Sequence, residues 1–514
     1  MPGKNNFLWG AFILGMAGII SKIIGAVYRI PLGRYLGGEG IGLYQMAYPF
    51  YTIILALATA GIPVAISIMI AQRETAGLSG DSRRIFRVSF VCLFFVGVLL
   101  SLLVYVIARP AAVYVMKQPK AALAIMAIAP AVFLASIESV FRGYFQGYQR
   151  MVPTAISQVV EQLFRAAFVV LLALWLLPRG LEVAAAGATF GAVIGGAAGV
   201  AVLVGIYIWD KLQYRPAYGL ARSSQSSLSL ASELLHLAVP VSLGAVVMPL
   251  VQLLDTIIVP MRLASLNLPI ERATELFGQL TGMASILVNL PMILTVSIGT
   301  SLVPAAAEAM ARHDRYSLYQ GINNGLRVGL ILVLPAAVGL AVLAEPIMSL
   351  LFDAPEAGIP LAYLSWAVIA LAVFQITGSS LQGIGLSKIP MRNLMITGVL
   401  KVIMNYTLTG ITLLNIKGPA ISTVIAFSIG ALLNMVELAR HSGVRYEWGR
   451  FAKLAVFSAF MGLAVKWCYT GLIGWNITSN IATTISIILG MLVYGFLLAI
   501  SKELDASALN YLRG

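Results

Sequence analysis

Charged residues are scarce in this 514-residue sequence. Asp, Glu, Lys and Arg make up 11% of it, whereas soluble globular proteins contain about 25%. The longest polar interval, 210–232, has only the length of a loop. Hydrophobic residues make up 60% of the chain, and the mean hydropathy is +0.92. The scarcity of charge excludes a soluble protein and predicts an all-α polytopic membrane protein with a single membrane domain, 1–514.

Cysteine and histidine are also rare. The two cysteines, Cys92 and Cys468, lie in apolar runs, and the three histidines are scattered singly along the chain. This excludes a disulfide framework and a metal cluster, and no cofactor is expected. The sequence contains no G-x-x-x-x-G-K-[ST] and no H-E-x-x-H motif. Because the predicted outer loops are also short, we expect a protein that is not an enzyme.

The charge that is present is mostly positive, with a formal net charge of +14. In a soluble protein such a charge would suggest nucleic acid as a partner, but no basic surface with interleaved aromatic residues is present. In membrane proteins Lys and Arg accumulate in cytoplasmic loops. One set of alternate loops holds more than twice as many basic residues as the other, which predicts that both termini are cytoplasmic. Membrane lipids, and not nucleic acid, are therefore the expected surroundings.

Apolar segments long enough to cross a bilayer recur along the whole chain. They predict about fourteen membrane-spanning helices. The segment 344–357 between the ninth and tenth is predicted to be a short interfacial helix. The predicted spans are 8–32, 44–71, 86–108, 121–145, 152–177, 183–209, 233–260, 273–301, 323–343, 358–383, 391–414, 418–439, 452–473 and 480–501.

An internal repeat indicates two related halves. The turn that begins Gln146-Gly147 resembles the turn that begins Gln382-Gly383, and the helix after each turn carries a basic residue at the same offset, Arg165 or Lys401. Two halves with an even number of helices have the same membrane orientation. The repeat predicts two pseudo-symmetric six-helix lobes, 1–210 and 233–440, and two extra C-terminal helices, 450–502. Such a duplicated fold favours a transporter with a site between the halves.

The first hydrophobic segment contains two basic residues. At 100° per residue, Gly15, Gly18, Lys22, Gly25 and Arg29 fall on one narrow stripe of a helix. A basic residue at the middle of a membrane helix costs about 2.5–3.5 kcal/mol on insertion scales. The stripe therefore predicts a polar, cationic interior, although the alternative that Arg29 extends to the membrane interface stays open.

The other intramembrane charges also favour an anionic ligand. The acids Glu138 and Glu161 each precede an arginine by four residues, the favourable order for a helical ion pair. If these pairs neutralise themselves, the interior retains an excess of positive charge, which suits a phosphate or pyrophosphate. The predicted pyrophosphate-binding residues are Lys22, Arg29, Arg165 and Lys401.

Polar uncharged side chains on the same helices are candidates for contacting a glycan or for lining the cavity. Hydroxyl and amide groups bind sugar hydroxyls, and they equally form hydrogen bonds between helices. For the single acid among these candidates, a role in the site and a salt bridge to another helix are equally open. The predicted cavity residues are Tyr44, Tyr48, Gln162, Asp255, Gln279 and Asn405.

Several short motifs together resemble a known family. They are Ser21-Lys22-x-x-Gly25, Leu43-Tyr44…Tyr48-Pro49, Ala60-Gly61-Ile-Pro63, Phe277-Gly278…Leu290-Pro291 and the two Gln-Gly turns. The chain is similar to the polysaccharide-biosynthesis branch of the multidrug/oligosaccharidyl-lipid/polysaccharide exporter superfamily. Within that branch it most resembles the stage V sporulation protein B group, which is related to the peptidoglycan lipid II flippase.

The resemblance implies a two-lobed transporter of the bacterial cytoplasmic membrane, monomeric, that moves a lipid-linked oligosaccharide outward by alternating access. Lys22 matches the first basic position of the family's first helix, whereas Tyr28 stands at the second basic position and Arg29 follows it. Gln279 stands where the family has an arginine. Two other hypotheses are a cation-coupled multidrug exporter of the same superfamily and a non-transporting protein of envelope assembly.

Overall fold

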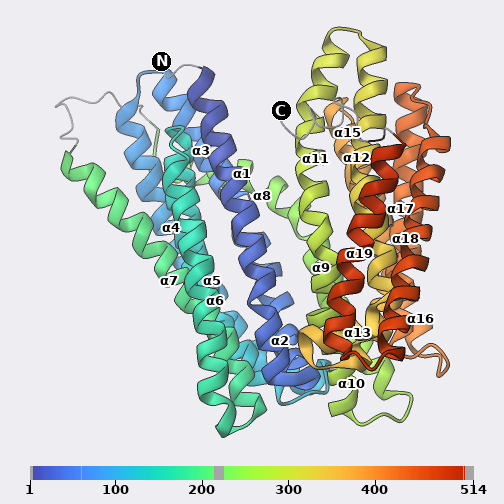
Figure 1. Cartoon of the computed structure of the whole chain (residues 1–514). Helices are drawn as coiled ribbons and strands as arrows, with labels where there is room; N and C mark the ends of the chain where they lie inside the picture. The colour runs from blue at the N-terminus through green and yellow to red at the C-terminus, as the bar shows by residue number, and fades with distance from the viewer. Residues whose placement is uncertain (1–3, 60, 214–224, 502, 504–514) are drawn as a thin grey trace. The chain divides into compact units, whose positions relative to one another are not determined.

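The computed structural model describes residues 4–59, 61–213, 225–501 and 503, and these residues are almost entirely helical (Figure 1). Within these ranges the chain contains no β-strand. The all-α prediction is thereby confirmed. Contacts between helices divide the chain into two compact units, Met1–Ile257 and Ile258–Gly514.

The described part of the first unit contains nine α-helices, of which the last crosses the boundary: α1 Lys4–Val27, α2 Arg29–Thr59, α3 Ile62–Thr75, α4 Ser79–Pro110, α5 Ala121–Gly147, α6 Val152–Leu176, α7 Leu181–Gln213, α8 Ser227–Ala245 and α9 Val247–Ala264. The second unit continues with α10 Ile270–Gly278, α11 Ser285–Ala311, α12 Arg315–Val342, α13 Ala344–Phe352, α14 Gly358–Leu364, α15 Ala367–Gly383, α16 Lys388–Thr409, α17 Lys417–Ser442, α18 Trp448–Gly474 and α19 Ser479–Ile500. Short π-helical turns follow α4 and α10.

Within the described residues, the fourteen predicted spans fall largely on helical segments, and residue 60 of the span 44–71 lies outside the described chain. By length and composition, twelve helical segments of the described chain can cross a membrane, or thirteen if the bent pair α14–α15 is one span. The apolar part of α1, Phe12–Val27, is shorter than these segments, and α16 is less hydrophobic because it carries three basic residues. The predicted interfacial segment 344–357 contains the nine-residue helix α13.

Two glycines determine the path of the chain in the region of the first two predicted spans, one between them and one inside the second. The segment 8–32 comprises α1 and the start of α2, with a one-residue break at Tyr28. The chain then turns at Gly37, whose φ of 64° and ψ of −173° lie in a region that is essentially restricted to glycine. At Gly61, between α2 and α3, an added Cβ would lie 2.0 Å from the carbonyl oxygen of Ala238 in α8. Glycine therefore permits both the turn and the close crossing of α8.

The predicted span 233–260 is divided into α8 and α9 at Val246. Leu230, Leu234 and Ala238 recur at every fourth position of α8 and are buried in the hydrophobic core formed by α3, α4, α5 and α7. Ser242 accepts a hydrogen bond of 3.1 Å from the backbone N–H of Gly61. The helix α8 is thus an integral part of the first unit, whereas the sequence repeat had assigned it to the C-terminal lobe.

A glycine seam joins α6 to α7. Glycines at every fourth position of α7 face α6, and an added Cβ would lie within 3 Å of α6 atoms at Gly191 and Gly195 and of a Leu176 side-chain atom at Gly187. Small residues at this spacing allow membrane helices to approach closely. The resulting van der Waals packing stabilises the helix pair, because lipid tails are apolar and there is no hydrophobic driving force for helices to associate. The charged residues of α6 lie along this seam.

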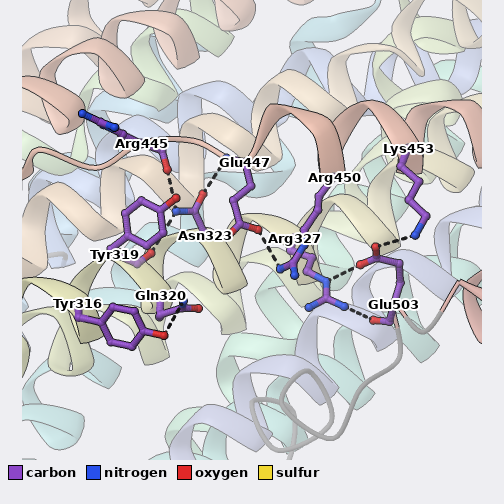
Figure 2. A network of polar contacts seen from close by, with 10 residues as sticks. All are labelled: Tyr316, Tyr319, Gln320, Asn323, Arg327, Arg445, Glu447, Arg450, Lys453 and Glu503. Atoms are coloured by element: carbon purple, nitrogen blue, oxygen red, sulfur yellow. Dashed lines mark hydrogen bonds and ion pairs between the residues drawn. The ribbon is translucent and has the colours of Figure 1, made fainter.

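Polar side chains of the second unit connect α12 to the segments that follow α17 and α19 (Figure 2). Arg327 of α12 lies 2.8 Å from the Glu503 carboxylate and donates a 2.6 Å hydrogen bond to the Glu503 carbonyl. Lys453 of α18 lies 3.2 Å from the other carboxylate oxygen of Glu503. One turn before Arg327, Asn323 accepts a hydrogen bond from the backbone N–H of Glu447. These contacts fasten the segments that follow α17 and α19 to α12.

Candidate functional site

Four ionisable side chains of α5 and α6 form a continuous chain of ion pairs. Arg142 Nη2 lies 3.0 Å from Glu138 Oε2 and 2.8 Å from Glu161 Oε2. The other oxygen of Glu161 lies 2.6 Å from Arg165 Nη2. Both predicted i, i+4 pairs are confirmed, and the bond between Arg142 and Glu161 links them across two helices. The order along the chain is Glu138, Arg142, Glu161, Arg165.

The chain of ion pairs is buried against α7. The side chains of Glu138, Glu161 and Arg165 are 4%, 11% and 9% exposed. An added Cβ at Gly195 would lie 2.7 Å from the Glu161 carbonyl oxygen, and one at Gly199 would lie 2.0 Å from Glu138 Oε1. The glycine seam therefore makes room for the charged groups as well as for the α6 backbone. Mutual pairing compensates the cost of burying these charges.

Tyrosines from the α1–α2 break and from α2 lie beside a third arginine. The hydroxyls of Tyr28 and Tyr44 are 3.0 Å apart, and the rings of Tyr44 and Tyr48 have centroids 5.2 Å apart. The ring of Tyr51 continues this row, with its centroid 6.1 Å from that of Tyr48. The guanidinium of Arg29 lies over the Tyr48 ring, 5.6 Å from its centroid, at cation–π distance. The ring row and Arg29 form one compact group.

Tyr48 connects this group to the ion pairs. Its phenol interacts electrostatically with both Arg165 and Arg29. Among the described residues of these two groups, the three guanidinium groups of Arg29, Arg142 and Arg165 outnumber the two carboxylates of Glu138 and Glu161. We call the group Arg29, Arg165, Tyr28, Tyr44, Tyr48 and Tyr51 the Arg–Tyr cluster.

The unused hydrogen-bonding capacity of the Arg–Tyr cluster indicates what it can bind. The Nε atoms of Arg29 and Arg165 are buried and have no hydrogen-bond partner within the described chain. Phenol hydroxyls add donors beside these guanidinium groups. Guanidinium and hydroxyl groups with spare donors are suited to an oxyanion such as a phosphate.

The predicted residues of the first unit separate into two groups. Arg29, Arg165, Tyr44 and Tyr48 come together in the Arg–Tyr cluster. Lys22 is exposed on α1. It follows Ser21, which donates a weak 3.4 Å hydrogen bond to the backbone of α6, so the face of α1 that packs on α6 lies beside Lys22 and does not include it.

The other predicted residues each lie within one of the two units. Gln162 is half-buried on α6 near Gly25 of α1, and Asp255 is half-buried on α9. In the second unit, Gln279 begins the π-helical turn after α10 and is buried, and its Oε1 atom has no hydrogen-bond partner among the described residues. Lys401 is half-buried on α16, where Asn405 is buried one turn later.

Sequence reasoning assigned Glu138 and Arg142 to a self-contained structural pair, did not place Tyr28 in the site, and considered Tyr51 on the same helical face as Tyr44 and Tyr48 without including it among the predicted site residues. The signal for the tyrosines was the spacing Tyr44, Tyr48, Tyr51, which places them on one helical face. No signal in the sequence indicates that Arg142 also pairs with Glu161. Among the residues that the structure describes, no group of three His, Cys, Asp or Glu side chains could hold a metal ion.

The fold and the site define a class of protein: a multi-pass helical membrane protein whose first unit encloses a buried, net cationic and tyrosine-lined cluster. Comparison with known proteins gives the family. Residues 7–310 match the model of the family described as "Polysaccharide biosynthesis protein", and residues 281–407 match the MatE model.

Relatives and a solved structure agree with this match. The chain is 30% identical to "Lipid II flippase MurJ" of Bacillus subtilis, over 90% of this chain and 88% of the relative. It is 28% identical to "Stage V sporulation protein B" of the same organism, over 90% of each chain. Its fold is similar to the structure "Lipid II flippase MurJ, inward closed conformation", with a TM-score of 0.73, 16% identity, and 96% and 99% of the two chains covered. The chain belongs to the polysaccharide biosynthesis protein family, in the lipid-flippase branch of the multidrug/oligosaccharidyl-lipid/polysaccharide exporter superfamily.

Proposed function

We propose that this protein is a flippase that translocates a lipid-linked glycan precursor across the bacterial cytoplasmic membrane by alternating access. The substrate would be an undecaprenyl-pyrophosphate-linked precursor of peptidoglycan or of another cell-wall or spore polysaccharide. The relatives named as a lipid II flippase and as a stage V sporulation protein support this proposal. The observation that carries it is the Arg–Tyr cluster, in which Arg29 and Arg165 both act on Tyr48.

Each part of the substrate has a chemical counterpart in the proposal. Arg29 and Arg165 attract the pyrophosphate, since their guanidinium groups have spare donors beside phenol hydroxyls. Lys22 and Lys401 are further proposed pyrophosphate contacts. Gln162, Asp255, Gln279 and Asn405, together with Tyr44 and Tyr48, are proposed to contact the glycan or line the cavity. The protein acts as a monomer with both termini in the cytoplasm, and translocation makes and breaks no covalent bond.

A second candidate is a cation-coupled multidrug exporter of the same superfamily, which the match of residues 281–407 to the MatE model favours. A cationic drug would need an acid that is not already neutralised. Within the first unit, the carboxylates of Glu138 and Glu161 are both bound to arginine. This pairing favours an anionic substrate for that unit.

The test is to compare Arg29→Gln and Arg165→Lys with the wild type in cells, scoring how much labelled lipid-linked precursor becomes accessible on the outer leaflet. We expect Arg29→Gln to reduce translocation by tenfold or more. Lysine at 165 retains the charge but not the planar fork, so it should reduce translocation less. The matched control is Arg179→Gln, because Arg179 also lies over an aromatic ring, that of Trp175, but is exposed. Normal translocation by Arg29→Gln at wild-type expression would exclude the site assignment.

A further inference from the structure

Two exposed arginines, Arg83 and Arg87, lie one turn apart near the start of α4. Three other arginines at this end of the first unit are held by contacts within the protein, in the pairs Arg73–Glu233, Arg84–Gln225 and Arg150–Asp210. Neither Arg83 nor Arg87 has an acid partner among the described residues. Their guanidinium groups therefore keep their donors available to a ligand from outside the protein.

The acids of neighbouring segments are already engaged or point elsewhere. Asp81 is fully buried, and because it lies two residues from Arg83 it is on the opposite side of α4. Asp210 of α7 is bound to Arg150. Glu74 of α3 accepts hydrogen bonds from two hydroxyl groups, at 2.6 and 3.1 Å. The start of α4 therefore presents an excess of positive charge.

A phenol hydroxyl lies beside the first of these arginines. Tyr144 of α5 is half-buried, and its phenol interacts electrostatically with Arg83. Its ring centroid lies 5.0 Å from that of Phe86 in α4 and 5.5 Å from that of Tyr207 in α7. Phe86 and Tyr207 stack on each other at 4.8 Å. These ring contacts hold the Tyr144 hydroxyl, a hydrogen-bond donor, next to the guanidinium of Arg83.

An apolar stripe continues from the two arginines along α4. Val91, Phe94, Val98, Leu102 and Tyr105 fall within about 100° of the face that carries Arg83 and Arg87, and they are between 39% and 57% exposed. From Arg87 to Tyr105 the helix rises about 27 Å, close to the thickness of the hydrocarbon core of a bilayer. The arginines therefore lie at one membrane interface, directly beyond a surface that faces acyl chains.

We propose that Arg83, Arg87 and Tyr144 bind the phosphodiester headgroup of an anionic phospholipid, whose acyl chains lie along the apolar stripe of α4. Guanidinium groups bind phosphate through paired hydrogen bonds, and basic sites between membrane helices bind anionic lipid headgroups. A free phosphate would use the charges and not the stripe, so the occupant is a lipid. The site shares no residue with the Arg–Tyr cluster, and the lipid it holds is a bound component of the membrane, distinct from the transported substrate.

The test is native mass spectrometry of the full-length protein in detergent, titrated with phosphatidylglycerol to give the Kd of the first bound lipid. Arg83→Gln combined with Arg87→Gln should raise this Kd about thirtyfold, at about fivefold for each arginine. Tyr144→Phe keeps the ring contacts and the net charge but loses the hydroxyl, and it should raise the Kd about fivefold. The matched control is Arg109→Gln, which removes an exposed arginine from the other end of the same helix and should leave the Kd unchanged.

A second measurement uses the wild type alone. Phosphatidylglycerol with a photoactivatable acyl chain, in nanodiscs of phosphatidylcholine, should crosslink chiefly to the exposed stripe of α4, and inorganic phosphate should not displace it. Equal Kd values for the wild type and the double variant, or the same loss in Arg109→Gln, would reduce the site to general attraction between a basic protein and an acidic lipid. Crosslinks spread evenly over the spans, or displacement by inorganic phosphate, would also overturn the proposal.

Discussion

The buried salt bridge between Arg327 and Glu503 allows a sharp prediction about stability. Glu503→Gln preserves the shape of the side chain but leaves Arg327, whose side chain is 6% exposed, without its carboxylate. Lys453 is 39% exposed and can move toward solvent, so the penalty arises chiefly from Arg327. Removing one partner of a buried pair costs about 3–5 kcal/mol. For a folding unit of this size, that corresponds to a Tm lowered by roughly 6–20 °C.

The assay is thermal unfolding of the purified protein followed by tryptophan fluorescence. The control is Glu308→Gln, which breaks the pair of Glu308 with Arg312 at side chains 62% and 73% exposed. An exposed pair contributes about 0–1 kcal/mol, so this variant should unfold close to the wild type. Arg327→Met combined with Glu503→Gln should recover part of the loss, because it removes the uncompensated charge. Equal Tm values for Glu503→Gln and Glu308→Gln would refute the reasoning.

Two further predictions follow from local geometry. Gly195→Ala places a Cβ 2.7 Å from the Glu161 carbonyl oxygen and should lower the free energy of unfolding by about 1–3 kcal/mol. Gly205→Ala on the same helix meets open space and should be neutral or slightly stabilising. Chemical denaturation measures both variants, and equal effects would contradict the glycine seam. Hydrogen bonds from the hydroxyl and backbone N–H of Ser317 hold the pKa of Asp314, the N-cap of α12, below its usual 3.8. A pKa that is lowered in the folded state contributes stability above pH 3.8, and this stability is lost as the pH falls through the lowered pKa. Asp314→Ala should therefore speed amide hydrogen exchange in the first turn of α12 near neutral pH, and the difference from the wild type should disappear in acid. A difference that persisted in acid would contradict this role of Asp314.

The sequence predicted features that depend on one helix at a time. The positions of the spans follow from apolar length, and the pairs of Glu138 with Arg142 and of Glu161 with Arg165 follow from a spacing of four residues, observed at 3.0 and 2.6 Å. The contacts between helices could not be predicted from the sequence, because they depend on which helices pack against each other. The bond from Arg142 to Glu161 arises because α7 presents glycines that let α6 pack closely, and periodicity alone does not name the partner of a polar face. The packing of α8 in the first unit was missed for the same reason.

The two basic residues of the first hydrophobic segment show how far a helical stripe can be interpreted. On an uninterrupted helix, Lys22 and Arg29 would lie on the same face, about 20° apart. The break at Tyr28 assigns them to different helices, α1 and α2. Tyr28 is buried and hydrogen-bonded to Tyr44, which brings the start of α2, and with it Arg29, against the Tyr48 ring.

Lys22 remains on a part of α1 where neighbouring Gly15 and Gly18 also meet open space. A basic residue at the middle of a membrane helix costs about 2.5–3.5 kcal/mol on insertion scales, so Lys22 requires polar surroundings. Arg29 has such surroundings within its own unit, in the ring and hydroxyls of α2. Arg29, displaced by one residue from the family pattern, is therefore the basic group of this segment that packs in the Arg–Tyr cluster, and its binding of substrate stays a prediction.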